Sequence, residues 1–290
     1  MNALIVTKPT NLEQHGQVVR AQIKRGKLTQ ASLEELETAH EEHYQSLARV
    51  REVLEAKQIN FEEISRGDRW PSKNDLDMVV SVGGDGTLLS ASHRILTEVP
   101  VIGVRSSNSS IGYLCACGYD GIEETIQKYL DGTIKLASCS RLRAIISYAE
   151  EGRERQTVPV LNDFLFANHN PSATTRYNIK LGTVTEAHKS SGVWVSTATG
   201  STAGILAAGG QKMDREDQKF QYRVRELYAA QETLYKLTSG FFDPEDNLIL
   251  ENRNEAAVLA LDGQRGVIPL KFGDTITFER AAPIKIAMAN

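Results

Sequence analysis

The sequence predicts an α/β N-terminal domain with a parallel sheet, followed by a mostly β C-terminal domain. In the first third of the chain, short apolar runs alternate with helical stretches, the pattern of a parallel sheet covered by helices. From about residue 134 onward, β-rich segments separated by Gly, Asn or Asp predominate. A chain of 290 residues is long enough for two domains. We expect the first at 1–118 and the second at 119–290, whose last strand can return to the first domain.

The elements of the first domain follow in order. The apolar run Ala3–Val6, closed by Pro9, predicts a buried strand. A stretch rich in Glu, Leu, Ala and Lys predicts a long surface helix over 32–58. His40 and His43 on it lack the spacing of a metal-binding helix and are expected on its solvated face. The remaining predictions are strands at 60–64, 78–82 and 100–104 and a helix at 88–96.

The second domain is expected to consist mainly of short strands. Most candidate segments are rich in β-forming residues and end at turn residues. A helical interlude is predicted at 224–237, and a short Ala-rich helix at 203–208. The predicted strands are 144–148, 158–167, 177–181, 193–196, 248–250, 257–261, 267–271 and 275–279.

Composition and charge argue against several classes of protein. A net charge of -4 is unlike that of a dedicated binder of nucleic acid or of anionic membranes. No window approaches 18 uninterrupted apolar residues, so no membrane-spanning helix is predicted. Cys115, Cys117 and Cys139 fit neither a disulfide framework nor the common zinc spacings and are expected to be small, reduced, buried hydrophobes. We therefore expect a cytoplasmic protein.

The most informative motif is a glycine-rich turn between a predicted strand and a predicted helix. Glycines bring the backbone close to a ligand, and they adopt positive φ at little cost. Amide groups at the start of the following helix favour an anion. The pattern is neither a Walker loop nor a dinucleotide fingerprint. The candidate phosphate ligands are Gly83, Gly84, Gly86 and Thr87.

Asp85 lies in the middle of this turn, where a negative charge repels phosphate unless it has a chemical role. It is a candidate general base for an attacking hydroxyl, or a ligand of a Mg²⁺ ion that neutralises the phosphates. The alternative is that Asp85 only caps the helix beginning near Thr87. The flanking glycines favour catalysis, since a cap requires none of them.

The segment Gly83–Thr87 resembles the signature of a superfamily that contains NAD kinases, diacylglycerol kinases, sphingosine kinases and 6-phosphofructokinases. All of these transfer phosphate to a hydroxyl. The resemblance implies the class of reaction but not the acceptor.

A second segment, Val160–Phe166, is similar to the Asn-Glu strand motif of NAD kinases, with Asp163 in place of the commoner Glu. In that family these side chains bind the adenosine part of NAD, which makes Asn162 and Asp163 candidate ligands. An Asn side chain pairs with an adenine edge or a ribose hydroxyl, and a carboxylate accepts from ribose hydroxyls. The alternative is an Asn-Asp turn.

A third segment, 190–204, resembles the long NAD-kinase motif built on Ser-Thr-x-Thr-Gly-Ser-Thr-Ala. Hydroxyls and amides at a junction between a strand and a helix suit a phosphate or a ribose. The alternative is a linker, but linkers do not follow an apolar run such as Val193–Val195. The candidate NAD ligands here are Ser191, Thr199, Gly200, Ser201 and Thr202.

Basic residues near these motifs are further candidates. Arg176 and Lys189, with Lys180 between them, can contact substrate phosphates; the alternative is ordinary solvated charges on strands. The segment Asp262–Gln264 is expected to be a hairpin turn first and a supporting element of the site second.

Three positions depart from the common pattern of the family. Ser191 stands where most bacterial NAD kinases have Asp, Gly204 where they have Tyr, and Arg105 where many have Asn. The segment around Lys189, together with Ser172 and Arg176 upstream, looks more like the divergent branch that includes mitochondrial NAD kinases of animals.

The resemblance implies an NAD kinase with a Rossmann-like first domain and NAD in the cleft between the domains. The reaction moves a phosphoryl group onto the 2′-hydroxyl of NAD from ATP, another triphosphate or polyphosphate, with Mg²⁺ bound to the donor and no metal site formed by protein residues alone. It also implies a homodimer or homotetramer, with no nucleic-acid or membrane partner. The alternatives are a lipid kinase of the diacylglycerol or sphingosine type, which the polar pair Asn162-Asp163 disfavours, and a non-catalytic nucleotide-binding relative.

Overall fold

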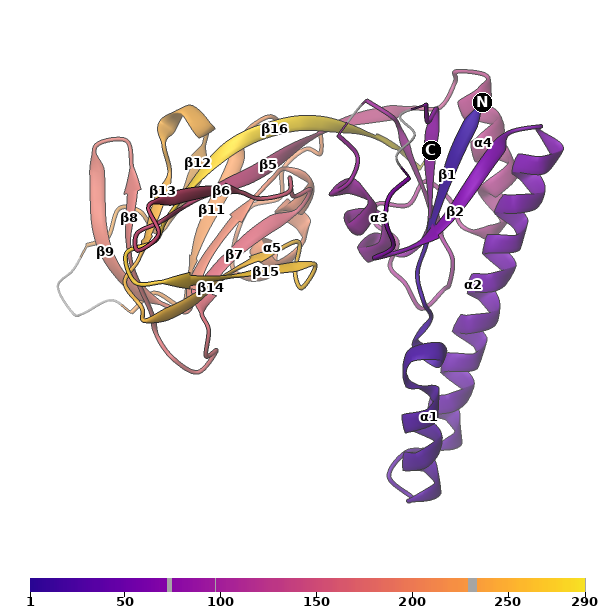
Figure 1. The fold of residues 1–290 in the computed structure, drawn as a ribbon, viewed down its shortest axis with the longest axis horizontal. Coiled ribbons are helices and arrows are strands. Elements are labelled where there is room, and N and C mark those ends of the chain that lie inside the picture. The colour runs from indigo at the N-terminus through magenta and orange to yellow at the C-terminus, as the bar shows by residue number, and fades with distance from the viewer. Residues whose placement is uncertain (72–74, 97, 229–233, 290) are drawn as a thin grey trace. The chain divides into compact units, whose positions relative to one another are not determined.

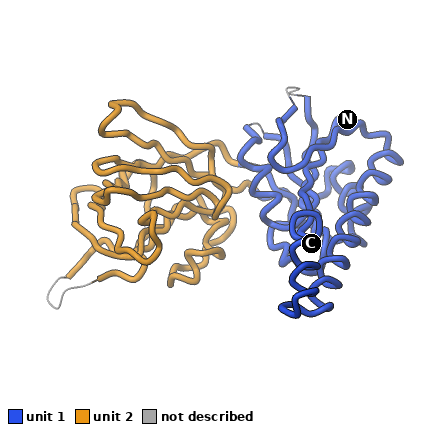
Figure 2. Tube along the Cα trace, turned by 60° about the horizontal axis from the view of Figure 1, so that its bottom comes forward, with its two compact units in different colours: residues 1–137, 284–290 blue, residues 138–283 orange. Residues whose placement is uncertain are grey.

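The computed structural model describes residues 1–71, 75–96, 98–228 and 234–289 (Figure 1). The chain divides into two compact units (Figure 2). Unit 1 comprises residues 1–137 and 284–290, and unit 2 comprises residues 138–283. The chain passes from unit 1 to unit 2 after residue 137, later than the expected boundary at 118. The reason is that the helix following residue 118 packs Ile122 and Ile126 into the core of unit 1.

Unit 1 is built on a parallel sheet in the order β2-β1-β3-β4. Because both faces of such a sheet are covered, its central strands are buried along most of their length, as residues 3–6 of β1 and all of β3 are. The end of β16 adds to this sheet, with Ile286 paired to Val101. The strands are β1 (Asn2–Thr7), β2 (Asn60–Ser65), β3 (Met78–Gly83) and β4 (Val101–Arg105).

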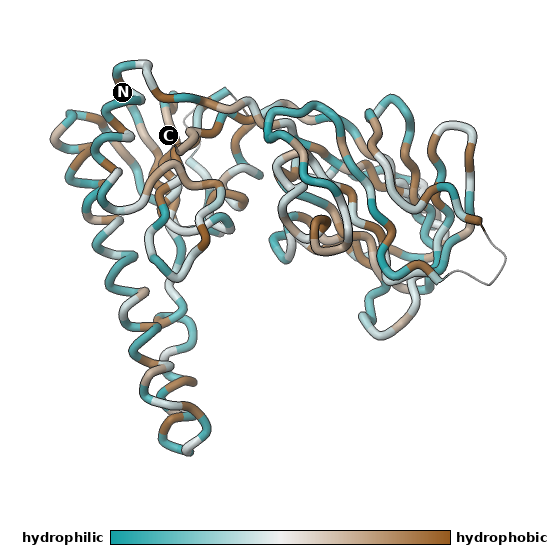
Figure 3. Tube along the Cα trace, turned by 180° about the vertical axis from the view of Figure 1, so that it is seen from behind, coloured by the Kyte–Doolittle hydropathy of each residue, from teal (hydrophilic) through white to brown (hydrophobic). Residues whose placement is uncertain are grey.

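Four α-helices accompany this sheet in the described part of the chain. The expected long helix is α2, and its apolar residues from Leu47 to Leu54 face the core. Figure 1 shows α1 packed along α2, and Figure 3 shows this pair as largely hydrophilic. The helices are α1 (Asn11–Lys24), α2 (Gln30–Ala56), α3 (Asp85–Ser92) and α4 (Ile122–Leu130), and the 3₁₀ turn η1 (Tyr119–Gly121) precedes α4.

The prediction of a solvated face was wrong for His43. Its ring is only 2% exposed, and it is hydrogen-bonded to the Thr7 hydroxyl at 3.0 Å and the Ser106 hydroxyl at 2.8 Å. His40 bonds the Thr10 hydroxyl at 2.8 Å. His43 therefore ties α2 to the segments in which β1 and β4 end.

Unit 2 contains two mainly antiparallel sheets that enclose an aromatic and aliphatic core. Phe164 and Phe166 of one sheet pack with Phe278 and Tyr177 of the other. One sheet has the order β12-β11-β10-β7-β14-β15. Its strands are β7 (Asp163–Asn168), β10 (Gly192–Ser196), β11 (Phe220–Arg225), β12 (Ser239–Phe242), β14 (Ala256–Leu261) and β15 (Gly266–Lys271).

The other sheet of unit 2 runs β16-β13-β8-β9, with β5 paired to β16 and β6 paired to β5. Its strands are β5 (Leu136–Tyr148), β6 (Arg153–Gln156), β8 (Thr175–Leu181), β9 (Val184–Ser190), β13 (Ile249–Asn252) and β16 (Thr275–Ala287). Short helical turns complete the unit: η2 (Thr199–Thr202), α5 (Gly204–Ala207) and η3 (Pro244–Asp246).

The helical interlude predicted at 224–237 was wrong. Residues 220–225 form β11, whose Phe220, Tyr222 and Val224 face the core in strict alternation. Neither 226–228 nor 234–237 is helical, and 229–233 lie outside the described residues. Within the described chain, no helix is long and apolar enough to cross a membrane.

Candidate functional site

The glycine-rich turn joins β3 to α3 in unit 1, as expected. None of Gly83, Gly84 and Gly86 has positive φ, so none of them is required for a left-handed backbone, and Gly83 and Gly84 are explained by the space around them. A Cβ on Gly83 would lie 2.2 Å from the Thr87 hydroxyl oxygen, and one on Gly84 would lie 3.0 Å from the Ser110 hydroxyl oxygen. Thr87 is 1% exposed, so its side chain shapes the turn, while Gly84 and Gly86 remain partly exposed.

Asp85 occupies the first turn of α3, but its carboxylate does not cap the helix. No side-chain cap bond is made at this end of α3, so the capping alternative was wrong. The carboxylate instead accepts the backbone N–H of Leu114 at 2.7 Å and that of Tyr113 at 3.1 Å, one on each oxygen. The loop after β4 thus fixes Asp85 in a defined orientation. Each oxygen retains acceptor capacity for a further hydroxyl.

In unit 2, Asn162 and Asp163 stand at the start of β7 and are held by a carboxylate from another part of the chain. Asp262 accepts the backbone N–H groups of Leu161, Asn162 and Asp163 at 3.1, 2.8 and 3.1 Å. Asp262 itself has φ +43°, in the turn that joins β14 to β15. The expected hairpin turn is confirmed, and it also anchors the Asn-Asp motif. The alternative of an Asn-Asp turn is wrong, because Asn162 lies in a bend and Asp163 is already the first residue of the central strand β7.

The Asp163 side chain is almost completely buried, at 4% exposure. Burial, and then the nearby charge of Asp262, raise the pKa of Asp163 to about 8. The protonated form therefore predominates at neutral pH, and Asp163 offers a hydroxyl donor as well as an acceptor. The sequence suggested only a carboxylate acceptor.

The Ser/Thr-rich motif packs tightly beneath the Asn-Asp motif. The Thr197 hydroxyl donates to the carbonyl oxygen of Leu161, and the Thr197 N–H to that of Asn162. A Cβ on Gly200 would lie 2.1 Å from the Asn162 carbonyl oxygen, so only glycine fits there. Thr199 and Ser201 are buried, and the Ser201 hydroxyl accepts the Met213 N–H; Thr202 is partly exposed. Thr197 and Gly200 of the Ser/Thr-rich motif therefore support the backbone of the Asn-Asp motif.

The glycine at position 204 has a local explanation. A Cβ on Gly204 would lie 2.8 Å from the Trp194 ring, so the ring occupies the space that a side chain would need. Ser191 is half-buried in the bend before β10, and its N–H bonds the Arg225 carbonyl oxygen. Ser191 and Gly204 thus lie at the two ends of the segment that carries Trp194.

Arg176 and Lys189 face each other across β8 and β9. Both side chains are exposed and make no hydrogen bond or ion pair with the described residues. They line a cavity of about 330 Å³ with Arg253, Tyr228 and Tyr235. Like charges directly opposite each other are unfavourable without an anion. The arrangement suits a phosphate, although solvated charges would also be exposed.

The described residues contain no group of three or more His, Cys, Asp or Glu that could hold a metal ion. Mg²⁺ is commonly bound through one or two carboxylates together with substrate phosphates. At the glycine-rich turn, Asp85 supplies one such carboxylate. The cysteines form no disulfide; Cys139 is buried and the other two are partly buried, and burial raises the pKa of the Cys115 thiol to about 12.

Sequence reasoning missed two supports of the site. The first is the loop at Tyr113–Leu114, whose amides bond Asp85. The second is Asp262, whose carboxylate accepts three backbone N–H groups at the Asn-Asp motif. For Asp262, the composition of the sequence indicated a turn but not the hydrogen bonds that it makes. The partners in these bonds lie about 100 residues away in the sequence.

Several known proteins are similar to this chain. A family model described as the ATP-NAD kinase N-terminal domain matches residues 4–134. The probable NADH kinase of Oryza sativa subsp. japonica is 30% identical over 264 residues, which cover 83% of this chain and 80% of that protein. The NADH kinase of Arabidopsis thaliana is 30% identical over 274 residues, with coverage of 87% and 85%.

Solved structures show the same fold. An NAD kinase from Archaeoglobus fulgidus in complex with ATP aligns with a TM-score of 0.70 at 17% identity, covering 100% of this chain and 94% of the other. Yeast NADH kinase complexed with NADH aligns with a TM-score of 0.74 at 16% identity, covering 100% and 84%.

Proposed function

Because this chain belongs to the NAD kinase family, we propose that it phosphorylates the 2′-hydroxyl of the adenosine ribose of NAD to give NADP. The 2′-oxygen attacks the terminal phosphorus of the donor, and the bond from that phosphorus to the bridging oxygen breaks. Asp85 takes the hydroxyl proton. The shortened donor leaves as the diphosphate when ATP is used.

The observation that supports this proposal is the fixed carboxylate at the glycine-rich turn. Asp85 is oriented by the Tyr113 and Leu114 amides and does not serve as a helix cap. A general base must be held in position and keep a free acceptor direction, and Asp85 meets both conditions. The backbone at Gly83, Gly84, Gly86 and the buried Thr87 forms the proposed donor cradle.

The other roles concern the binding of NAD. Asn162 and protonated Asp163 bind the adenosine, on the platform formed by Asp262 and the Ser/Thr-rich motif. Arg176 and Lys189 contact a phosphate of NAD, because they form an exposed cationic pair. Ser191 and the exposed part of Thr202 are proposed to line the remainder of the NAD site, with Thr199, Gly200 and Ser201 shaping it from below.

The test is NADP formation from NAD, ATP and Mg²⁺ by the wild type, by Asp85→Asn and by Asp131→Asn. Asp131 is an exposed residue at the end of α4, and its replacement should leave the rate unchanged. Removing a general base should lower kcat by at least about 10²-fold. Undiminished turnover in Asp85→Asn would exclude Asp85 as the base. A folded wild type that binds NAD but forms no product with any donor would indicate a non-catalytic relative.

A second candidate acceptor is NADH. Two relatives that cover more than four fifths of this chain are named as a probable NADH kinase and an NADH kinase. Comparing kcat/KM for NADH and for NAD decides between them, because a preference is the ratio of these two constants.

Three further properties belong to the same proposal. Mg²⁺ would be bound to the donor, where it would neutralise phosphate charge. We propose a homodimer or homotetramer, which light scattering tests. We also propose a cytoplasmic location, consistent with three free cysteines in a reducing compartment.

A further inference from the structure

Arg105 lies directly beside the glycine-rich turn. It is the last residue of β4 and is paired in register with Gly83, the first glycine of the turn. The next residue is also bonded to this glycine: the Ser106 N–H donates to the Gly83 carbonyl oxygen at 3.0 Å. The chain thus places a guanidinium group next to the proposed donor cradle.

The Arg105 side chain passes over two glycines. A Cβ on Gly112 would lie 2.7 Å from Arg105 Cδ, and one on Gly118 would lie 3.8 Å from Arg105 Nη2. Gly112 has φ +67°, which independently favours glycine. The same loop holds Asp85 through the next two amides, at Tyr113 and Leu114. One loop therefore supports both charged groups.

The Arg105 guanidinium is half-buried and makes no hydrogen bond or ion pair with the described residues. Its charge acts only through space: it contributes to lowering the pKa of Glu42 and opposes the burial that raises the pKa of Cys115. Asp85 acts on the same thiol with the opposite sign, so both charges lie near Cys115. An unpaired, half-buried guanidinium is suited to an oxyanion that the protein itself does not supply.

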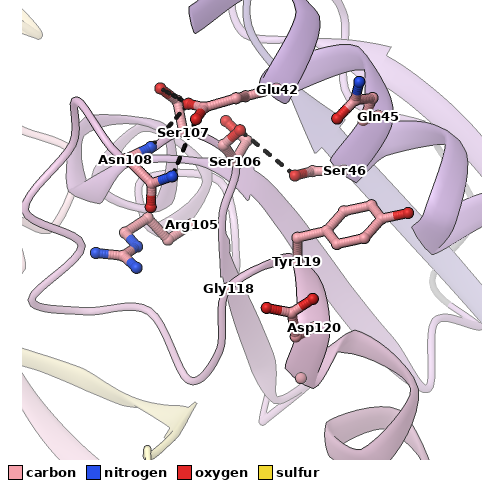
Figure 4. Close-up of a pocket in the computed structure, with 11 residues that line it drawn as sticks. Glu42, Gln45, Ser46, Arg105, Ser106, Ser107, Asn108, Gly118, Tyr119 and Asp120 are labelled. Atoms are coloured by element: carbon pink, nitrogen blue, oxygen red, sulfur yellow. Dashed lines mark hydrogen bonds between the residues drawn. The ribbon is translucent and has the colours of Figure 1, made fainter.

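Arg105 also lines a polar cavity of about 420 Å³. Figure 4 shows this pocket between α2, which carries Gln45 and Ser46, and η1, which carries Tyr119 and Asp120. The Glu42 carboxylate is already engaged by Ser107 and Asn108. An aromatic ring, an amide and a free carboxylate suit a base and ribose hydroxyls better than they suit a chain of phosphates.

We propose that Arg105 binds the phosphate chain of the donor and that the pocket beside it holds the donor's nucleoside. This proposal rests on the proposed function for the identity of the reaction, but not for the binding event. A phosphate chain is common to nucleoside triphosphates and inorganic polyphosphate. The pocket makes a nucleoside triphosphate the better ligand.

The test measures binding without turnover. A non-hydrolysable ATP analogue with Mg²⁺ is titrated by calorimetry into the wild type, Arg105→Gln, Arg105→Lys and the control Arg25→Gln, whose residue is exposed at the end of α1. Loss of a charge-assisted contact should weaken binding by at least about tenfold in Arg105→Gln, and by less in Arg105→Lys. Arg25→Gln should bind as the wild type does.

Tripolyphosphate titrated in the same way separates the two parts of the proposal. The wild type should bind it more weakly than the ATP analogue, and Arg105→Gln should weaken both ligands. Equal affinity of the wild type for both ligands would overturn the nucleoside pocket. Unchanged affinity of both Arg105 variants for both ligands would overturn the role of Arg105.

Kinetics separates this proposal from the proposed function. With NAD as acceptor, Arg105→Gln should raise KM for ATP at least about tenfold while KM for NAD changes little. A wild type that binds the ATP analogue through Arg105 but forms no NADP would refute the proposed function and leave the donor site standing. An Arg105→Lys protein with the melting temperature of the wild type excludes misfolding as the cause.

Discussion

Asp163 and Asp262 show how much the surroundings of a single carboxyl group determine what it does. Asp262 lies at a turn, where its carboxylate accepts three backbone N–H groups. Asp163, at the start of the strand that Asp262 anchors, is buried and holds its proton to about pH 8. Both aspartates are buried, but Asp262 anchors the backbone through three hydrogen bonds, whereas burial and the charge of Asp262 raise the pKa of Asp163.

Asp163→Asn should stabilise the protein as pH rises. The unfolded carboxyl ionises near its ordinary pKa of 3.8, whereas the folded one is protonated up to about 8, so wild-type stability falls as pH increases through that window. Asparagine has no proton to lose. We expect a melting temperature about 5 °C or more above the wild type at pH 8.5 and little difference at pH 4.

Scanning calorimetry across this pH range measures the effect. The matched control is Asp214→Asn, at an exposed position whose amide can accept the same Glu216 N–H. A constant offset between Asp163→Asn and the wild type at all pH values would mean that Asp163 is ionised in the folded protein.

At the scale of elements, α2 is joined to the ends of β1 and β4 by one buried histidine. His43 bonds both Thr7 and Ser106, and burial lowers its pKa to about 4. Because an unfolded histidine takes up a proton near pH 6.5, this neutral histidine contributes stability above that value and loses it as pH falls toward 4.

His43→Leu should therefore destabilise unit 1 by about 2–3 kcal/mol at pH 7.5, since it leaves two hydroxyls without their partner. The difference from the wild type should shrink as the pH falls from 7 to 4.5. Urea unfolding at several pH values tests this, with His15→Gln on the exposed face of α1 as the control. An unchanged unfolding midpoint at pH 7.5 would show that the hydrogen bonds of His43 contribute nothing to the stability of unit 1.

The elements that sequence reasoning found are those with strong local signals. β1, β3 and β4 were predicted because their apolar runs are buried on both faces. β11 was missed, and its last two residues were assigned to a helical segment beginning at 224, although β11 buries alternate apolar residues and pairs with β10. α1 was missed, although Thr10 and Glu13 form a capping box, which is a sequence signal for the start of a helix.

In the candidate site, too, the parts with strong local signals could be predicted. Its motifs are local and could be predicted, as Asp85 and the Asn162-Asp163 pair were. Its supports could not, because they join residues far apart: Asp262 reaches back about 100 positions, and the loop at Leu114 reaches back to Asp85. Pairings at this separation depend on the folded topology and leave no periodic trace in the sequence.

At the scale of the whole molecule, unit 2 is inserted between two parts of unit 1. Ile284 and Ile286 are completely buried in unit 1, although the chain reaches them only after unit 2. Ile286→Ala should destabilise unit 1 by about 2–5 kcal/mol.

The two tryptophans lie in different units, so each unit can be followed separately. With Trp194→Phe as background, Trp70 reports urea unfolding of unit 1 alone. The Ile286→Ala midpoint should fall relative to that background. The control Val267→Ala, at an exposed position of β15 in unit 2, should leave the Trp70 transition unchanged. Equal midpoints with and without Ile286→Ala would mean that the returning strand does not stabilise unit 1.

The returning strand also has a consequence for synthesis on the ribosome. All of unit 2, including the first part of β16, is made as one uninterrupted segment before Ile284, at which the end of β16 returns to unit 1. Unit 1, whose first 137 residues emerge earliest, must wait for the last few to complete its sheet. The part of the protein that is translated first is thus the part that is finished last, and until then its open sheet edge beside β4 is a natural substrate for a chaperone.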